Sequence, residues 1–562
     1  MRYFLLLALL FSQITGQSQN LQLNWANQFA GSQEMEVADM AVDGNGNFLL
    51  TGYIIGTCDF DPSTNVYELT SAGGFDAFVC KLNPTGQLIW AHAIGSTSSD
   101  SGNGIDVDSD GNVVVVGSFR NTVDFDPSAS TAELTSAGSG DAFVLKLDED
   151  GNFLWVQRFG SLNSDDADAV VIDNNNNIIV AGGFQSTVDF DPGSGTQNLT
   201  ASGSSVDAYF LRLTAAGDFS YAKRFGGSGS DAVRKLEVDA DNNVYFAGHF
   251  SSTASFSPGS TLNLTSAGST DAVIGKLNAS GALFWAREFG GSQADSGFDI
   301  AVDASGNVYG VGYFRFLADF LPGSGVLQVF AEGESDAFAI KLNGSGNFQW
   351  MRKFGGMDFD YAECVELDPS ENLVIAGHFY GMSDFDPNEN ASVLLTSAEG
   401  ADIFITSITS NGDFLWTDHV AGTGDQIAKT MVVDANNQIH VAGSFEETTD
   451  FDTGTGIDNL TSAGATDGFL TSLSALTVSV PAAEQPDVLV YPNPSSGSFQ
   501  LRFGERAEFK LSIVDMLGKI VVQKTGSAES ITVTNEIGPG IYTLNLILDK
   551  KLRPSQTIII TP

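Results

Sequence analysis

The feature that most constrains the fold of this chain is an internal repeat. Six tryptophans, with a tyrosine in one intervening place, recur at intervals of 64 to 66 residues, at Trp25, Trp90, Trp155, Tyr221, Trp285, Trp350 and Trp416. An aspartate that opens a D-A-F-like segment recurs at similar intervals, at Asp76, Asp141, Asp207, Asp271, Asp336, Asp402 and Asp467. Copies of such constant length predict one closed array, because a string of independent domains tolerates more variation in length.

Each copy of the repeat predicts four β-strands. In the second copy, residues 104–107 alternate between apolar and polar, and residues 112–119 form a continuous valine-rich run. Residues 141–147 and 152–159 follow as a hairpin that turns at residues 148–151. A run without a polar face must be covered on both sides. Four such strands in each of seven copies predict an all-β fold, a seven-bladed β-propeller with four-stranded blades.

The two ends of the repeat region predict how the array closes. The first copy begins late, with the tryptophan strand at residues 21–29, and the last copy stops after residues 467–473. We therefore expect the N-terminal strand to complete the last blade, which removes an exposed sheet edge. A solenoid is the alternative, and it would need capping segments that the sequence does not show.

The repeat has the motif V-D-x-x-G-N-x-x-x-x-G-x-F followed by D-A-F-x-x-K-L-x-x-x-G-x-x-x-W. It stands at residues 107–119 with 141–155, and again at residues 302–314 with 336–350. This motif resembles the SBBP β-propeller repeat of secreted bacterial proteins, and the resemblance covers roughly residues 21–474. Members of that family share a fold and no single activity, so the resemblance implies architecture more than chemistry.

The first residues are typical of a secretory signal peptide. Arg2 precedes an apolar run at residues 3–11, and Gly16 offers a small residue for cleavage. The run is too short to span a bilayer, and no longer apolar run occurs elsewhere, so we expect no transmembrane segment. The sequence thus predicts a signal peptide at residues 1–16 and a propeller at residues 17–474. An apolar first strand is the alternative reading of the run.

Cysteine content and charge limit the possible partners. Cys58, Cys80 and Cys364 are an odd number of cysteines, which excludes a complete disulfide framework. Cys58 and Cys80 could pair within one blade, but we expect all three to be small core residues. Residues 17–486 hold 16 basic and 62 acidic side chains. Such a negative field repels nucleic acid and anionic lipid and favours cations or cationic surfaces.

Acidic loops follow the second strand of most copies with the motif D-F-D-P. In an extended segment the two aspartates face one way and the phenylalanine the other. One interpretation is that the phenylalanine packs between blades while the carboxylates cap loop amides. The other is a Ca²⁺ site, because paired carboxylates supply oxygen ligands. Its candidate ligands are Asp59, Asp61, Asp124, Asp126, Asp189, Asp191, Asp384, Asp386, Asp450 and Asp452.

Strand order places the loops after the second and fourth strands of every copy on one face, here called the broad face. Loops held by a rigid scaffold are the usual place for binding residues. At the position after the glycine of the second strand, the fourth, fifth and sixth copies carry His249, Tyr313 and His378. Arg315 enters the same sector, and Tyr53 holds the position in the first copy. We hypothesise that these residues bind a glycan or peptide, with drift among the copies as the alternative.

Catalytic motifs are missing from the sequence. It contains no G-x-S-x-G, no H-E-x-x-H and no C-x-x-C, and its five histidines are scattered over different copies. We therefore expect a non-catalytic, monomeric binding or adhesion module whose partner is an extracellular glycan or protein. A structural matrix protein is the alternative, and a hydrolase or lyase acting on extracellular polysaccharide is less favoured.

The composition changes after the repeats. Residues 475–487 are typical of a linker, and residues 488–562 predict six or seven short strands, a small Ig-like β-sandwich. This segment resembles the C-terminal sorting domain (type A) of type IX secretion substrates. The motif residues are Tyr491, Pro492, Asn493, Pro494, Gly497, Gly518, Lys519, Gly540 and Tyr542. The resemblance implies contact with the type IX secretion machinery and a secreted or outer-surface location in a Bacteroidota-type bacterium. A plain adhesive sandwich is the alternative.

Overall fold

The computed structural model of this chain describes residues 21–257, 262–323, 325–388, 391–475, 488–491, 498–515, 519–534, 537, 540–548, 551–552 and 556–560. The predicted signal peptide at residues 1–16 lies outside the described residues. The chain divides into two compact parts, residues 1–476 and 477–562, and the division falls inside the predicted linker. All regular elements among the described residues are β-strands.

The four strands predicted from the second copy are confirmed. They are β8 (Ser101–Val107), β9 (Val113–Phe119), β12 (Asp141–Leu147) and β13 (Phe153–Phe159), antiparallel in the order β13-β12-β9-β8. We call this four-stranded group unit two and number the other groups in chain order.

The strands of the other groups, each group beginning with its innermost strand, are as follows. Unit one has β2 (Glu34–Val42), β3 (Phe48–Ile55), β6 (Asp76–Leu82) and β7 (Leu88–Ile94); unit three has β14 (Ala169–Ile172), β15 (Ile178–Phe184), β18 (Asp207–Leu213) and β19 (Phe219–Gly227). Unit four has β20 (Ala232–Val238), β21 (Val244–Ser257), β22 (Asn263–Leu277) and β23 (Leu283–Gly291); unit five has β24 (Ser296–Val302), β25 (Val308–Phe314), β28 (Asp336–Leu342) and β29 (Phe348–Gly356). Unit six has β30 (Asp360–Leu367), β31 (Leu373–Asp384), β32 (Leu394–Ile408) and β33 (Phe414–Gly422); unit seven has β34 (Gln426–Val433), β35 (Gln438–Phe445), β38 (Asp467–Ala475) and β1 (Leu21–Gly31).

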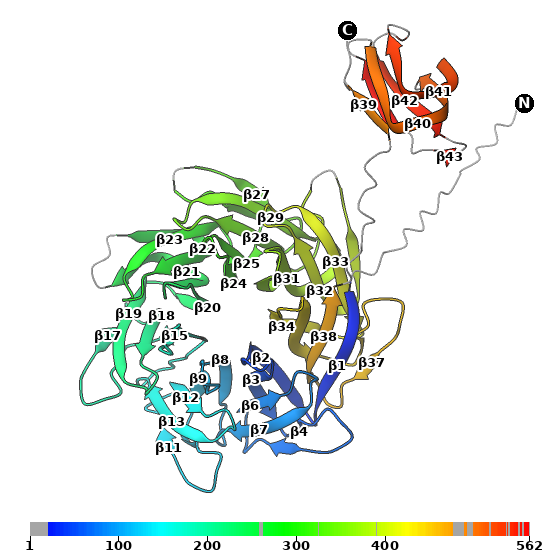
Figure 1. Ribbon diagram of the computed structural model, residues 1–562. Helices are drawn as coiled ribbons and strands as arrows, with labels where there is room; N and C mark the ends of the chain where they lie inside the picture. Colours follow the sequence, from blue (N-terminus) through cyan, green and yellow to red (C-terminus); the bar gives the residue numbers. More distant parts are fainter. Residues whose placement is uncertain are drawn as a thin grey trace, which may run out of the picture. The chain divides into compact units, whose positions relative to one another are not determined.

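The N-terminal strand completes the last unit, as the sequence predicted. Strand β1 pairs antiparallel with β38, from Leu21 opposite Ala475 to Phe29 opposite Gly468. The Leu21 amide also donates to Asp418 Oδ2 in unit six at 2.7 Å. Each innermost strand contacts the innermost strands of the units before and after it, and β34 contacts β2. The units therefore form a closed ring around one axis, which Figure 1 shows with β2, β8, β20, β24 and β34 toward the centre.

Both faces of each sheet are buried against the neighbouring units. In unit two, Val114 and Val116 pack in one cluster with Tyr209 of unit three. Val113 and Val115, on the other face of the same strand, pack with residues of unit one. This arrangement explains the apolar runs without a polar face, because successive side chains of a strand point to opposite sides. Cys58, Cys80 and Cys364 are free and buried, so the prediction that they are core residues is confirmed.

The tryptophan of the repeat joins one unit to the next. The indole Nε1 of Trp350 donates to the Ser410 carbonyl in the hairpin turn of unit six at 3.1 Å. Lys341, from the D-A-F-x-x-K segment, donates to the same carbonyl at 2.9 Å. Equivalent indole bonds run from Trp90 to Glu149 O and from Trp285 to Gly344 O, both at 3.2 Å. In unit three the tyrosine Tyr221 stands in this place, and its hydroxyl has no hydrogen-bond partner within the described part of the chain.

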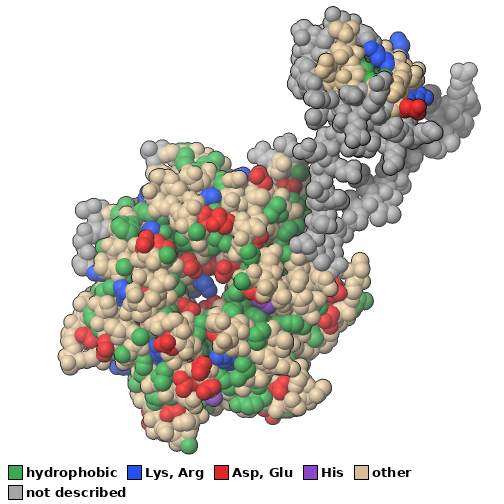
Figure 2. All heavy atoms as spheres, in the orientation of Figure 1, with side chains coloured by type: hydrophobic (Ala, Val, Ile, Leu, Met, Phe, Trp, Pro, Cys, Tyr) green, Lys and Arg blue, Asp and Glu red, His purple; other side chains and the backbone are tan. Residues whose placement is uncertain are grey.

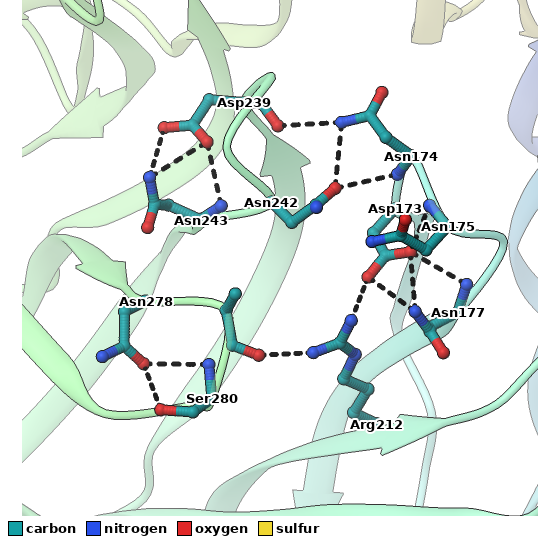
Figure 3. Close-up of polar contacts among 11 residues, drawn as sticks. Asp173, Asn174, Asn175, Asn177, Arg212, Asp239, Asn242, Asn243, Asn278 and Ser280 are labelled. Carbon is teal, nitrogen blue, oxygen red and sulfur yellow. Dashed lines mark hydrogen bonds and ion pairs between the residues drawn. The ribbon is translucent and has the colours of Figure 1, made fainter.

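Asparagine-rich turns join the units on the face opposite the broad face. Asp173 accepts hydrogen bonds from the Asn177 amide and side chain and pairs with Arg212, which also donates to the Ala279 carbonyl of unit four. Asn174 Nδ2 donates to Asn242 Oδ1 at 2.9 Å and to the Asp239 carbonyl at 3.1 Å, as Figure 3 shows. These bonds connect the turn of unit three to the turns of unit four. The repeated aspartates and asparagines of this face therefore have a structural role.

The long loop of each unit contains a short two-stranded ribbon that the sequence did not predict. The separate ribbons are β4 (Thr57–Asp59) with β5 (Glu68–Thr70), β10 (Thr122–Asp124) with β11 (Glu133–Thr135), β16 (Thr187–Asp189) with β17 (Asn198–Thr200), β26 (Leu317–Asp319) with β27 (Gln328–Phe330), and β36 (Thr448–Asp450) with β37 (Asn459–Thr461). In units four and six the ribbon continues the second and third strands, β21 with β22 and β31 with β32.

The C-terminal part of the chain is a network of strands, six of which lie in the described residues. They are β39 (Val488–Tyr491), β40 (Ser498–Asp515), β41 (Ile520–Thr534), β42 (Gly540–Leu548), β43 (Lys551–Leu552) and β44 (Gln556–Ile560). The order is β39-β40-β42-β43, with β41 beside β40 and β44 beside β42. Strand β40 is longer than the short strands expected from the sequence, and its register against β41 shifts between Arg502 and Ala507. The Ig-like sandwich stays a prediction.

We expect Trp350→Phe to lower the free energy of unfolding by about 1–2 kcal/mol, because it removes the indole donor and part of the contact with unit six. Tyr221→Phe is the matched control at the same repeat position. It removes a hydroxyl without a partner in the described structure and is expected to leave stability unchanged or slightly higher. Urea unfolding followed by circular dichroism measures both. Equal losses for the two variants would contradict the role assigned to the indole.

Candidate functional site

Six of the seven innermost strands carry one residue that the partner strand does not match. The register shifts lie between Val37 and Asp39 in unit one and between Val233 and Lys235 in unit four, with equivalent shifts in units two, five, six and seven. Such a β-bulge turns a side chain in a new direction. The bulged residues are Ala38, Asn103, Arg234, Phe298, Glu363 and Lys429, and Asp168 holds the equivalent place before β14. All seven line a central cavity of about 420 Å³.

The repeat copies differ most in chemistry at this cavity. The bulged position holds an alanine, an amide, two acids, two bases and a phenylalanine, whereas the tryptophan and aspartate positions that define the repeat keep nearly one residue type. Figure 2 shows acidic and basic side chains together in the central hollow of the ring. Because the scaffold residues repeat while these residues do not, the central cavity is the place where the ring is chemically asymmetric. We take it as the candidate site.

An ion pair crosses the cavity. Lys235 Nζ of unit four donates to Asp39 Oδ1 of unit one at 2.8 Å. Asp39 also accepts the Ile105 amide of unit two at 3.0 Å and the Thr430 hydroxyl of unit seven at 3.3 Å. Burial by itself lowers the pKa of Lys235, but the carboxylates of Asp39 and Asp299 outweigh it and the pKa is raised. Lys235 therefore keeps its charge and ties opposite sides of the ring together.

Carboxyl groups surround this lysine. Burial raises the pKa of Asp106 and Glu237 to about 7 and that of Glu366 to about 8. Asp106 Oδ2 accepts the Ile172 amide of unit three at 2.7 Å, and Asp299 Oδ2 accepts the Val365 amide of unit six at 2.9 Å. These acids bond innermost strands to one another, so they belong to the scaffold of the cavity.

Arg234 is the exposed cation of the cavity. Its side chain makes no hydrogen bond or salt bridge to any residue that the structure describes. Burial raises the pKa values of Asp166, Asp168 and Tyr313, and the nearby positive charge of Arg234 opposes that rise at each of them. Lys429, the other bulged base, lies 3.5 Å from Glu36 Oε1. The guanidinium of Arg234 is thus available to a ligand.

Aromatic rings lie beside the cavity in units five and six. The ring centroids of Phe298 and Tyr313 are 5.3 Å apart, those of Tyr313 and Tyr361 5.1 Å, and those of Tyr361 and His378 4.9 Å. The Arg315 guanidinium lies 5.5 Å from the Tyr313 ring centroid. The structure therefore brings together Tyr313, Arg315 and His378 among the residues chosen from the sequence. It joins them through Phe298 and Tyr361; we call these five residues the aromatic cluster.

The two histidines of the hypothesis do not lie side by side with Tyr313 at the surface. Tyr361 stands between Tyr313 and His378, and His378 is only 8% exposed. His249 contacts Ser296 Oγ at 3.2 Å. Burial, helped by Lys429, lowers the pKa of His378 to about 3, and burial with Arg234 lowers that of His249 to about 4. Both imidazoles are therefore neutral near pH 7.

Tyr53 lies outside the aromatic cluster. Its hydroxyl donates to Glu34 Oε1 at 2.9 Å, and its ring packs against Phe75 in unit one with centroids 4.5 Å apart. Sequence reasoning missed Arg234, Phe298, Tyr361 and Lys429, although three of these, Arg234, Phe298 and Lys429, are bulged residues whose chemistry differs between the copies. Aligning the seven copies on the residue five places before the D-x-x-x-N turn would have singled that column out.

The acidic loops follow the capping interpretation. Asp59 Oδ1 accepts the amides of Asp61 and Tyr67 at 3.1 and 2.8 Å, and Asp61 Oδ1 accepts the Ser63 amide at 2.9 Å. The first aspartate of each equivalent loop, Asp124, Asp189, Asp384 and Asp450, accepts the amide of the second in the same way. Phe60 is fully buried. Within the described residues no group of three His, Cys, Asp or Glu side chains is arranged to hold a metal ion. The calcium site stays a prediction.

Pairs of buried aspartates hold the broad-face loops. Asp295 accepts the Gly291 amide at 2.7 Å and the Arg315 amide at 2.8 Å, which places Arg315 beside the aromatic cluster. A Cβ added to Gly290 would lie 2.8 Å from both Asp271 Oδ1 and Asp295 Oδ2, so the two carboxyl groups face each other across this glycine. Burial raises the pKa of Asp271 to about 6, and burial with Asp271 raises that of Asp295 to about 7.

Two family models match parts of the chain. The model described as a secretion system C-terminal sorting domain matches residues 489–561, and the model described as a beta-propeller repeat matches residues 285–313. The chain therefore combines the two modules that its motifs resemble. The sorting domain implies interaction with the type IX secretion machinery and a secreted or cell-surface location in Bacteroidota-type bacteria. Of its motif residues, Pro492, Asn493, Pro494, Gly497 and Gly518 lie outside the described residues.

Two curated proteins are distant relatives. An uncharacterized WD repeat-containing protein of Acanthamoeba polyphaga mimivirus is 21% identical over 435 residues, which are 64% of this chain and 31% of that protein. The regulatory protein FlaEY of Caulobacter vibrioides is 26% identical over 187 residues, 32% of this chain and 19% of that protein. The chain thus spans less than a third of the length of either relative.

Solved structures show only weak likeness. Sqt1 from Chaetomium thermophilum has a TM-score of 0.40 at 10% identity, covering 80% of this chain and 99% of that one. The Pan2 WD40 domain of Neurospora crassa has a TM-score of 0.38 at 10% identity, covering 77% and 88%. Scores this low transfer neither fold nor function, so the architecture rests on the strand pairing. Among the described residues no helix is long and apolar enough to cross a membrane.

We expect Asp271→Asn to raise the free energy of unfolding at pH 8 by about 1–2 kcal/mol. The folded-state pKa of Asp271 is raised, so this carboxyl favours folding when protonated, and that contribution is lost as pH rises through about 6. The amide mimics the protonated form, so the gain should vanish near pH 4. Asp141→Asn is the control at the same repeat position. Asp141 is paired with Arg158 at 2.7 Å, and its replacement should destabilise the chain at pH 8. A gain from Asp271→Asn that is equal at both pH values contradicts this account.

Proposed function

We propose that this chain is an exported, non-catalytic binding protein. Its repeat region acts as a seven-bladed propeller closed by β1, and an Ig-like sorting domain directs it through the type IX secretion route. The observation that carries the proposal is the pattern of difference among the repeat copies. The residues that hold units together recur, whereas the bulged residues around the central cavity differ in every unit. A scaffold that fixes a varied set of side chains at one place is suited to selective binding.

The ligand that fits the site best is a glycan that carries a single carboxylate, because Arg234 binds that group locally although the repeat region as a whole is acidic. The exposed Arg234 guanidinium offers paired donors in the geometry that a carboxylate accepts. The rings of Phe298 and Tyr313 offer apolar faces of the kind that stack on sugar rings, and neighbouring carboxylates such as Glu363 can accept hydrogen bonds from hydroxyl groups. Neutral imidazoles at His249 and His378 add hydrogen-bonding capacity without charge.

The distribution of the histidines supports a non-catalytic role. His92 stacks on Trp90 with ring centroids 5.3 Å apart, and His440 packs against Phe48 at 4.7 Å. Burial lowers the pKa of both imidazoles and of His419. A general base needs a reacting proton within hydrogen-bond reach, and these three histidines are structural parts of separate units. We further propose a monomer, because the pairing of β1 with β38 leaves the ring without an open seam.

Arg234→Ala and Tyr313→Ser are each expected to weaken binding of a uronic-acid oligosaccharide at least roughly tenfold. Tyr313→Ser gives unit five the serine that units two and seven carry at this position, Ser118 and Ser444, so the strand should remain folded. A glycan array followed by calorimetry on the best oligosaccharide measures the effect. Ser118→Ala, in the same position outside the aromatic cluster, is the control and should leave affinity unchanged. If Arg234→Ala and Tyr313→Ser weaken binding of a peptide rather than of a glycan, or if both variants bind the glycan normally, the proposed ligand class is wrong.

A further inference from the structure

The ribbons of the long loops carry an outward-facing pair of side chains. In five units this pair consists of two threonines whose hydroxyls are hydrogen-bonded, such as Thr57 with Thr70, at distances of 2.8 to 3.2 Å. Hydroxyl pairs are suited to a solvent-facing ribbon, because they bond to each other and to water. The usual side chains at this surface of the repeat are therefore polar, which we call the polar standard, and each unit can be compared with it.

Units five and six depart from the polar standard together. In unit five the pair is Leu317 with Phe330, and Phe330 is 54% exposed. In unit six Met382 stands opposite Thr396 and is 57% exposed. Leu394, at a position where the other units carry Glu, Asn or Gln, is 50% exposed. Neighbouring units thus expose apolar side chains where the repeat places polar ones, which is the signature of an interaction surface.

Phe316 adds backbone strain to the same surface. It lies at the turn after β25 with φ of 57°, and its side chain is 52% exposed. Five other units place glycine or a small polar residue there, such as Gly56 and Asn121, and unit seven places Glu447. A bulky side chain disfavours the left-handed conformation, and such outliers concentrate at functional positions. The ring centroids of Phe316 and Phe330 are 4.9 Å apart and the ring planes are inclined at 63°, so together they form one exposed aromatic projection.

A groove borders this projection. Its volume is about 650 Å³, and its walls include Phe330 of unit five and the Asp384 and Asp386 loop of unit six. The cations near it are already engaged: Lys353 lies 2.8 Å from Glu332 and 3.2 Å from Asp336, and Arg352 Nε donates to the Gly412 carbonyl at 2.7 Å. Exposed carboxylates at Glu334 and Asp358 extend the negative charge around the surface.

We propose that Phe316, Leu317, Phe330, Met382 and Leu394, here called the ribbon patch, dock a protein segment that combines apolar side chains with net positive charge. The repeat region carries 62 acidic against 16 basic side chains, so a second copy of the chain and an anionic membrane are both repelled. A flexible methionine and a leucine on the ribbon of unit six, with the phenylalanine pair of unit five, are suited to an apolar peptide, because phenylalanine and methionine are enriched at protein interfaces. The ribbon patch shares no residue with the aromatic cluster, so this inference goes beyond the proposed glycan site.

The test uses the full chain with Phe316→Ser, Leu317→Thr and Phe330→Thr combined. These changes give unit five the residues of unit three, Ser186, Thr187 and Thr200, without altering charge. The probe is a labelled peptide of alternating lysine and leucine, and a lysine and serine peptide of equal charge is the comparison. We expect the variant to bind the lysine–leucine peptide at least roughly tenfold more weakly, with a melting temperature unchanged or raised because the strain at Phe316 is relieved.

Two controls keep the test decisive. Met382→Thr with Leu394→Asn copies unit seven, where Thr448 and Asn459 stand, and should weaken the same probe by a smaller factor even if the first variant fails to fold. Tyr313→Ser, which alters the glycan site, should leave peptide binding unchanged. The proposal is overturned if the two peptides bind equally well, if both ribbon variants retain full affinity, or if the ribbon variants lose only neutral-oligosaccharide binding or self-association.

Discussion

The structure depends on burial of both faces of every four-stranded sheet. A unit such as unit two presents valines to unit one on one side and to unit three on the other, so no unit can bury its apolar surface alone. Stability therefore belongs to the ring, and it is complete only where β1 fills the place of the fourth strand in unit seven. The polar ties, from indole to turn carbonyl and from carboxylate to strand amide, fix the angle at which neighbouring sheets meet.

This shared stability separates the residues of the repeat into two groups. Tryptophan, the lysine of the D-A-F segment and the turn aspartates recur because each unit needs the same ties to its neighbours. The bulged residues carry no such duty, and the β-bulge turns them toward the axis, where seven different environments meet. Among the described residues, the outward-facing side chains of the ribbons also make no contact that holds units together, so units five and six can depart from the threonine pairs. The candidate binding residues therefore lie at repeat positions that do not hold the units together.

Much of the fold could be predicted from the sequence because it rests on local pattern. Valine-rich runs indicated the strands, and the constant repeat length indicated the ring. The truncated first and last copies predicted that the strand at residues 21–29 pairs with the last copy, as it does. The ribbons were missed because three-residue strands are too short to show a period. The site was found only in part: Tyr313 and His378 do meet, but through Tyr361, and a one-residue bulge that exposes Arg234 has no signature in a single copy. Burial of His378 likewise depends on a neighbouring unit that strand pattern cannot place.

The pairing of β1 with β38 has a consequence for biosynthesis. Residues 439 to 454 positions apart form the seam, so β1, the first of the described strands to be synthesised, waits longest for its partner. Contacts of such long range close slowly, and both seam edges stay unpaired until translation has passed Ala475. The sorting domain follows immediately afterwards in the chain. A prematurely terminated product that lacks β38 therefore also lacks the sorting domain. Only chains that contain both strands of the seam carry the sorting domain.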